Sequence, residues 1–397
     1  MTPVDTGHGA RLSLTRMLTA GRRRGACPTG LMAGPPTISG ITKVAWEDAV
    51  PQEWAAGKRL PAGQETPPLP PTSASVSRDG GLKDTPANRA LHPKVTPQEV
   101  FQNPGLLHHA YYADQRSIVL HGDVRHSLRR LIDGGVEVDC IVTSPPYYGQ
   151  RDYGIDGQLG LENHPQQFID HLAEVFSLCG ELLRETGSLW INIGDTYWSG
   201  KGAHKSGELK QGARRFGLRP QDRTGDGKWA RPKQLLLIPH RLAIALQEQG
   251  WLVRNDVVWI KPHPVPDQVR DRCSISHEYV FHLTKSRWYY YDRHAVGRRL
   301  PSGRVLPALD TWEVPPAAGN GAHRASFSED LIRIPVLSTT PAQGIVLDPF
   351  NGSGTSMIFA RKHGFRSIGI DLSEQYCEDT ARELKKLDAA ETLGHGA

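Results

Sequence analysis

Short apolar runs alternate along this chain with segments whose apolar residues recur at helical spacing. The predicted strands are residues 117–120, 138–142, 188–193, 255–260, 277–283, 287–291, 344–348 and 367–371. The predicted helices include a segment around Leu128 and residues 168–183, 238–249, 355–362 and 374–386. Strands that alternate with helices form a largely parallel sheet that carries helices on both faces. We therefore expect an α/β fold of the Rossmann-like type, in which residues 277–283 and 287–291 form a hairpin.

The ordered pattern is confined to residues 115–390, which we predict to be one domain. Residues 1–95 contain 12 of the 30 prolines and no sustained apolar periodicity, so they are predicted to be a disordered tail. Two irregular stretches interrupt the domain at residues 199–233 and 293–322. The first has ten lysines and arginines against three acidic residues. Long insertions in an α/β domain commonly carry function.

Composition excludes several classes of protein. No apolar run approaches the roughly 18 residues that suggest a membrane span, so no membrane partner is expected. The five cysteines are scattered without ligand spacing, which argues against a metal site or a disulfide framework and favours a reducing cytoplasm. The net charge of +5 permits a polyanionic partner but does not identify one.

A glycine-rich turn follows the predicted strand 344–348. The strand ends in Asp348, and the turn contains Phe350, Gly352 and Gly354 before the next helix begins. The following strand ends in Asp371, where nucleotide-binding α/β folds place an acid that accepts hydrogen bonds from ribose. The turn lacks the third glycine of a dinucleotide fingerprint and the lysine of a phosphate loop. A nucleoside ligand without pyrophosphate fits it better than NAD or ATP.

A second motif, Ser144-Pro145-Pro146-Tyr147, stands at the end of the predicted strand 138–142. The two prolines stiffen the turn and remove two amide donors, which leaves carbonyl groups and the Ser144 hydroxyl as acceptors. The tyrosine offers a face for stacking. Acceptors beside an aromatic ring suit a planar heterocycle that carries an amino group.

Together the two motifs resemble the amino-methylating DNA methyltransferases of restriction-modification type. Their order, with the catalytic motif first and the cofactor motif last, is similar to the circularly permuted beta group of that family. The resemblance covers residues 116–386 and includes Asp123 after the first strand and Phe327 before the cofactor strand; Ser328 stands where the family has proline. It implies a permuted S-adenosylmethionine-dependent methyltransferase fold, with S-adenosyl-L-methionine as the cofactor. The implied cofactor-binding residues are Asp123, Phe327, Asp348, Phe350, Gly352, Gly354 and Asp371.

The resemblance also implies a substrate and a mechanism. Double-stranded DNA is the expected partner, and a cognate restriction endonuclease that acts separately is left open. A cytoplasmic protein encoded by a bacterium or a phage is expected. The target base would be flipped out of the duplex, with Ser144 and Pro145 accepting from its amino group and Tyr147 stacking on it. Cys140 lies inside a strand and is interpreted as a core residue rather than the nucleophile of carbon-5 methylation.

The serine of the motif, followed by residues 148–153 (YGQRDY), is more typical of cytosine-N4 than of adenine-N6 enzymes, and adenine-N6 remains the alternative. A more remote alternative is a DNA-binding protein that has kept the fold without catalysis. Cations in the first insertion are candidates for DNA phosphate contacts, which position the duplex without reading sequence. These candidates are Arg214, Arg215, Arg219 and Lys228. Base readout is expected from residues 293–316.

Overall fold

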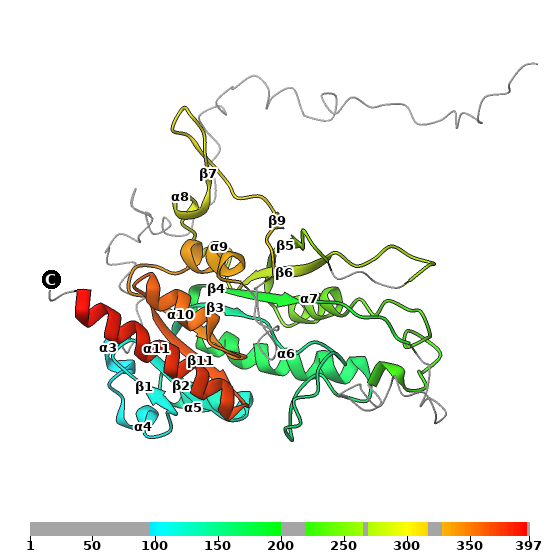
Figure 1. Ribbon diagram of the computed structural model, residues 1–397, viewed down its shortest axis with the longest axis horizontal. Helices are drawn as coiled ribbons and strands as arrows, with labels where there is room; N and C mark the ends of the chain where they lie inside the picture. The colour runs from blue at the N-terminus through cyan, green and yellow to red at the C-terminus, as the bar shows by residue number, and fades with distance from the viewer. Residues whose placement is uncertain (1–95, 200–219, 265–268, 317–327, 395–397) are drawn as a thin grey trace, which may run out of the picture. The chain divides into compact units, whose positions relative to one another are not determined.

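The computed structural model describes residues 96–199, 220–264, 269–316 and 328–394. The predicted disordered tail, residues 1–95, lies outside the described residues. The main feature is a nine-stranded sheet with the order β1-β2-β11-β10-β3-β4-β6-β5-β9 (Figure 1). Its strands are β1 (Tyr112–Ala113), β2 (Ser117–His121), β3 (Val138–Thr143), β4 (Leu183–Ile193), β5 (Leu252–Ile260), β6 (His277–Thr284), β9 (Thr311–Glu313), β10 (Ile345–Asp348) and β11 (Arg366–Asp371).

Helices connect and cover these strands. They are α3 (Pro97–Val100), α4 (Pro104–Leu107), α5 (Val124–Asp133), α6 (Pro165–Leu182), α7 (Ile238–Glu248), α8 (Arg293–Val296), α9 (Glu329–Thr339), α10 (Thr355–Lys362) and α11 (Glu374–Gly394), with a short 3₁₀ turn η2 (Pro220–Asp222). A separate antiparallel ribbon of β7 (Arg298–Arg299) and β8 (Val305–Leu306) follows α8. None of the helices among the described residues is long and apolar enough to span a bilayer.

The centre of the sheet is parallel. Strands β2, β11, β10, β3 and β4 run in one direction, while β1 and β6 are antiparallel to their neighbours. The chain passes from β3 to β4 on one side and from β10 to β11 on the other, so the order reverses between β3 and β10. In open α/β sheets, ligands bind at the carboxyl ends of the strands beside such a reversal. The predicted α/β fold is confirmed, with the catalytic motif before the cofactor motif.

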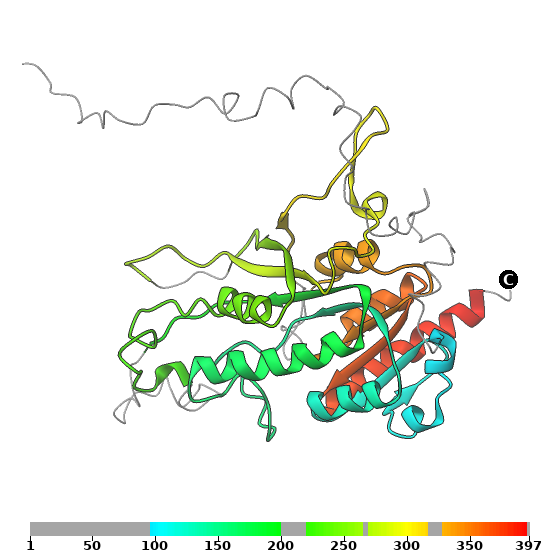
Figure 2. The same cartoon turned by 180° about the vertical axis from the view of Figure 1, so that it is seen from behind.

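Both faces of the sheet are buried. Helices α5, α6 and α7 pack on one face, and α9, α10 and α11 pack on the other (Figures 1 and 2). Strand β10 shows the alternation, because Leu347 belongs to the first core and Val346 to the second. Successive side chains of a strand point to opposite faces, so a strand that is covered on both sides reads as a continuous apolar run.

Two local predictions differ from the structure. Residues 287–291, all of them described, form no strand, because β6 already pairs with β4 on one edge and with β5 on the other. The hairpin partner of β6 is therefore β5. Helix α9 was not predicted, since Pro335 lies inside it and is atypical of a helix interior. Packing of Leu331, Ile332 and Val336 against the sheet stabilises this helix.

Candidate functional site

The two motifs meet at the reversal of strand order. The catalytic motif begins directly after β3, and Asp348 ends the neighbouring strand β10. The Thr143 hydroxyl donates a hydrogen bond of 2.6 Å to Asp348 Oδ1 and so ties the two strand ends together. Residues about 200 positions apart in sequence thus form one site.

Asp348 supports the cofactor turn from beneath. It is buried, and it accepts hydrogen bonds from the Thr143 hydroxyl, the Phe350 N–H (3.1 Å) and the Ser356 hydroxyl (2.6 Å). Burial raises the pKa of Asp348 to about 6, against the opposing effect of these donors. The described residues that line the neighbouring pocket, which is presented below, do not include Asp348. The structure therefore assigns Asp348 to holding the turn and the two strands in place.

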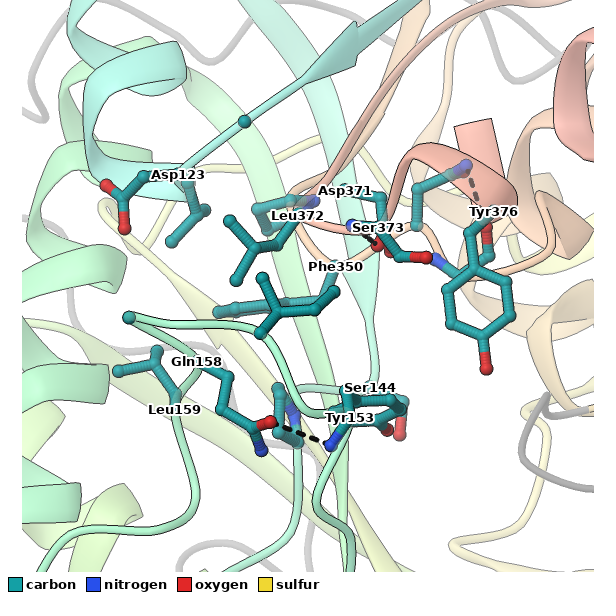
Figure 3. A pocket seen from close by; sticks show the side chains of 18 of the residues that line it. Asp123, Ser144, Tyr153, Gln158, Leu159, Phe350, Asp371, Leu372, Ser373 and Tyr376 are labelled. Carbon is teal, nitrogen blue, oxygen red and sulfur yellow. Dashed lines mark hydrogen bonds between the residues drawn. The ribbon is translucent and has the colours of Figure 1, made fainter. Parts of the chain in front are cut away.

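A pocket opens above this support. Its wall includes Asp123 after β2, Phe350 and Gly352 of the cofactor turn, Asp371 at the end of β11 and Tyr376 of α11 (Figure 3). Ser144 and Pro146 of the catalytic motif line the same pocket. The cavity is therefore continuous from Asp123, Phe350, Gly352 and Asp371 of the predicted cofactor set to Ser144 and Pro146 of the catalytic motif.

Asp371 has the geometry expected of an acid that binds ribose. Its Oδ2 accepts from the Gly352 N–H at 2.7 Å and its Oδ1 from the Ser373 N–H at 2.8 Å. A carboxylate has about four acceptor positions, so two stay available for the hydroxyls of a ligand. Burial raises the pKa of Asp371 to about 6. Beside it, the half-buried ring of Phe350 gives the pocket an apolar wall. This set of side chains fits a nucleoside.

The two positions of the turn, 352 and 354, require glycine for different physical reasons. Both have positive φ, +52° at Gly352 and +84° at Gly354. Gly352 lines the pocket, and a Cβ there would meet nothing within 4 Å. A Cβ at Gly354 would lie 2.7 Å from the Thr380 side chain of α11, and Gly354 is not among the described residues that line the pocket. Gly354, predicted beside the cofactor, is instead required by its conformation and by packing on α11.

The catalytic motif is held by a buried asparagine. Asn192, near the end of β4, receives the Ser144 hydroxyl on Oδ1 at 3.3 Å, and Tyr147 Oη lies 3.0 Å from the same atom. Tyr147 Oη also donates to Glu278 Oε2 at 2.5 Å, and Glu278 forms an ion pair with Lys261. The catalytic motif therefore belongs to a hydrogen-bonded network with three further residues, Asn192, Glu278 and Lys261.

Neither Asn192 nor Glu278 was predicted as a site residue. Because β6 runs antiparallel to β4, the start of β6 meets the carboxyl end of β4 and brings Glu278 to the same edge. Polar residues at the ends of otherwise apolar strands were the signal that could have identified them.

The tyrosine predicted to stack on the base is half-buried. A Cβ added at Gly194 would lie 2.7 Å from the Tyr147 ring, so the ring rests directly on that backbone. Burial first, and then the charge of Glu278, raise the pKa of the Tyr147 phenol well above its ordinary value. Tyr147 therefore keeps its proton and acts as a donor. The ring is held in place by these contacts, and its stacking on a base stays a prediction.

Phe327, Arg214, Arg215 and Arg219 are outside the described residues. Lys228 is exposed, and its backbone N–H donates to Asp226.

Cys140 is fully buried in β3, and burial raises the pKa of its thiol to about 12, which confirms it as a core residue. In the described part of the chain, no group of three or more His, Cys, Asp or Glu side chains could hold a metal ion.

Comparison with known proteins identifies the family. Residues 138–383, more than half of the chain, match the N6/N4 family described as DNA methylase. The chain is 43% identical over 270 residues to the Type II methyltransferase M.Cfr9I of Citrobacter freundii, covering 68% of this chain and 88% of the relative. It is 40% identical over 269 residues to M.XycI of Xanthomonas campestris pv. cyanopsidis, with the same coverage.

Among solved structures, the cytosine-N4-specific PvuII DNA methyltransferase aligns with a TM-score of 0.49 and 17% identity, over 68% of this chain and 86% of that one. The family match and the curated relatives confirm the resemblance that the two motifs predicted. The chain belongs to the N6/N4 family of DNA methylases, enzymes that take their methyl group from S-adenosylmethionine.

Proposed function

We propose that this enzyme methylates the exocyclic N4 of cytosine in double-stranded DNA, by base flipping and direct transfer. The observation that carries the proposal is the single pocket lined both by Ser144 and Pro146 and by Gly352 and Asp371. A methyl donor held by the second pair would lie against a base held by the first. Transfer between two such ligands requires alignment and charge placement more than a covalent intermediate.

The cofactor residues follow from the lining of the pocket. S-adenosylmethionine supplies a methyl group on a sulfonium centre, which is a good leaving group. Asp371 has free acceptor positions for the ribose hydroxyls, and Gly352 lets the backbone approach closely. Phe350 offers an apolar face. Asp123 caps α5 through hydrogen bonds from the Arg125 and His126 N–H groups, and so fixes the opposite wall.

The catalytic motif would act on the amino group of the base. An exocyclic amine is a poor nucleophile, because its lone pair is delocalised into the ring. The Ser144 hydroxyl and the Pro145 carbonyl would accept its two hydrogens and return electron density to nitrogen. Pro145 is buried two residues after the end of β3, so its carbonyl belongs to a rigid turn. Tyr147 would stack on the base.

The choice of cytosine-N4 rests on the sequence of the motif. Ser144 occupies its first position, and residues 148–153 follow the pattern that resembles cytosine-N4 enzymes. Adenine-N6 is the alternative within the same family. Incubating the protein with unmethylated genomic DNA and labelled S-adenosylmethionine, then hydrolysing the DNA to nucleosides, separates the two. Label in N4-methylcytosine is expected; label in N6-methyladenine would overturn the choice, and no label in DNA would favour a non-catalytic DNA-binding protein.

Contacts to the duplex are proposed for the two insertions. The cationic stretch 199–233, with Lys228 exposed, would contact phosphates and position the DNA. Residues 293–316, which contain α8 and the β7–β8 ribbon, would read base edges.

The methylated duplex would resist a cognate restriction endonuclease that acts separately. A DNA substrate and the bacterial sources of the relatives favour a cytoplasmic protein of a bacterium or phage.

The role of Tyr147 has its own test. Removing the ring by Tyr147→Ala should lower kcat by roughly 5- to 150-fold, the range equivalent to base stacking on an aromatic ring. Cofactor affinity should stay unchanged, because Tyr147 does not line the described part of the cofactor pocket. Trp288→Ala, which removes an exposed aromatic ring remote from the motif, is the control. Wild-type kcat in the Tyr147 variant would make this residue a structural support alone.

A further inference from the structure

A chain of polar contacts leads from Lys261 to the catalytic serine. Lys261 Nζ pairs with Glu278 Oε1, Tyr147 Oη donates to Glu278 Oε2, and the Ser144 hydroxyl donates to Asn192 Oδ1. The side chain of Glu278 is 14% exposed and that of Lys261 is 26% exposed. The question is which atom each proton occupies, because that decides whether Ser144 can accept from a base.

The orientation of Asn192 is fixed by the backbone. Its Nδ2 donates to the Tyr279 carbonyl oxygen at 3.2 Å and lies 3.4 Å from Glu278 Oε2. A carbonyl oxygen accepts only, so the amide nitrogen must face it. Oδ1 is therefore directed to Ser144 and Tyr147, and it is an acceptor for either hydroxyl.

The proton of Tyr147 goes to the carboxylate. Tyr147 Oη has one proton and two acceptors, Glu278 Oε2 at 2.5 Å and Asn192 Oδ1 at 3.0 Å. The closer acceptor is also the charged one, and hydrogen bonds to a charged acceptor are the stronger ones. Asn192 Oδ1 has two lone pairs, and it then accepts from the Ser144 hydroxyl without a second, competing hydroxyl donor. With its proton committed to Asn192, the Ser144 oxygen presents lone pairs to the pocket.

We propose that Glu278 is a positioning residue that draws the Tyr147 proton away from Asn192 and thereby makes Ser144 an acceptor for the amino group of the target base. The inference rests on the proposed function, since it presupposes that Ser144 contacts that amino group. Lys261 contributes by occupying Oε1, which leaves Oε2 for Tyr147.

The variant Glu278→Gln reverses the direction of these bonds. Lys261 has only donors, so it attracts the amide oxygen of the new side chain and turns the amide nitrogen to Tyr147. Tyr147 then receives a hydrogen bond and gives its own proton to Asn192 Oδ1. Asn192 Oδ1 then accepts from both hydroxyls, which weakens its bond to Ser144 and lets the Ser144 proton turn toward the amino group that Ser144 must accept from.

The expected result is a single-turnover rate of methyl transfer about tenfold lower than that of the wild type, the order of one hydrogen bond lost in the transition state. The cofactor dissociation constant should stay at the wild-type value, which also verifies folding. The measurement is single-turnover transfer from labelled S-adenosylmethionine to unmethylated genomic DNA. Glu248→Gln, the same change at an exposed position of α7, is the matched control and should match the wild type.

The decisive variant adds Tyr147→Phe. Phenylalanine keeps the ring but carries no proton to pass to Asn192, so Glu278→Gln should have no further effect in that background. The double variant should therefore have the same rate as Tyr147→Phe alone. A residue that merely supports the fold would lower the rate equally in both backgrounds, and that outcome would overturn the proposal, as would a wild-type rate for Glu278→Gln. Ser144→Ala distinguishes a failure of the role proposed for Glu278 from a failure of the proposed function. Wild-type turnover in that variant would refute the role of Ser144 itself.

Discussion

Replacing Thr143 by valine removes one hydroxyl and keeps the branched shape that favours a strand. The hydroxyl donates to Asp348 across the junction of β3 and β10, and both residues are 1% exposed, so water has no access to replace it. Asp348 Oδ1 would keep the Phe350 N–H as its remaining donor. A hydrogen bond to a charged group contributes about 1.5–3 kcal/mol. We expect Thr143→Val to lower the free energy of unfolding by about that amount at pH 8, where Asp348 is ionised.

The loss should depend on pH in a defined direction. The pKa of Asp348 in the folded protein is about 6, above its ordinary value of 3.8, so protonation stabilises the fold as the pH falls from about 6 towards 3.8. Valine removes a group that favours the ionised form and raises this pKa further. The variant therefore gains more stability than the wild type on acidification, and the difference between them should shrink at pH 5.

Urea unfolding followed by tryptophan fluorescence, at pH 8 and at pH 5, measures both quantities. Thr284→Val is the control, because the buried Thr284 hydroxyl donates to the neutral carbonyl of Ser286. Its cost should be about 1 kcal/mol and independent of pH. A loss below about 0.5 kcal/mol for Thr143→Val at pH 8, less than the usual net value of a hydrogen bond, would refute the assigned role of the junction. An equal loss at both pH values would refute the ionised state of Asp348.

Two further predictions concern the cofactor turn. Asp371→Ala should weaken S-adenosylmethionine binding by about 1–3 kcal/mol in calorimetry. The affinity of the wild type should also fall below pH 6, because Asp371, with a pKa of about 6, gains a proton there. An affinity that changes with neither the substitution nor the pH would exclude a ribose contact. Gly354→Ala should destabilise the fold in thermal unfolding by more than Gly364→Ala, which should cost about 1–2 kcal/mol for its φ of +79° in open space. The additional loss of stability at Gly354 measures the steric contact of the new Cβ with Thr380. Equal losses in the two variants would show that the Thr380 side chain moves away at no cost.

Local patterns determined the secondary structure of this protein where the apolar period was regular. The buried strands β2, β3 and β10 are mainly apolar, and such runs form strands wherever a sheet is covered on both faces. The prediction was wrong at residues 287–291, and it missed α9. In both cases tertiary packing outweighs the local preference, since strand pairing needs a free edge and Pro335 is tolerated because its helix packs on the sheet.

The sequence by itself also determined which chemistry to expect, because Ser144–Tyr147 and the turn after Asp348 each follow a strand and each carry groups suited to one ligand. Only the tertiary structure decided which of these residues line the pocket and which support it from within the core. Asp348 proved to be a buried support, while Asp371 lines the pocket. Asn192 and Glu278 contact the motif from 45 and 131 positions beyond Tyr147. Hydrogen bonds over such separations depend on strand order and register, and no local pattern of residues encodes these.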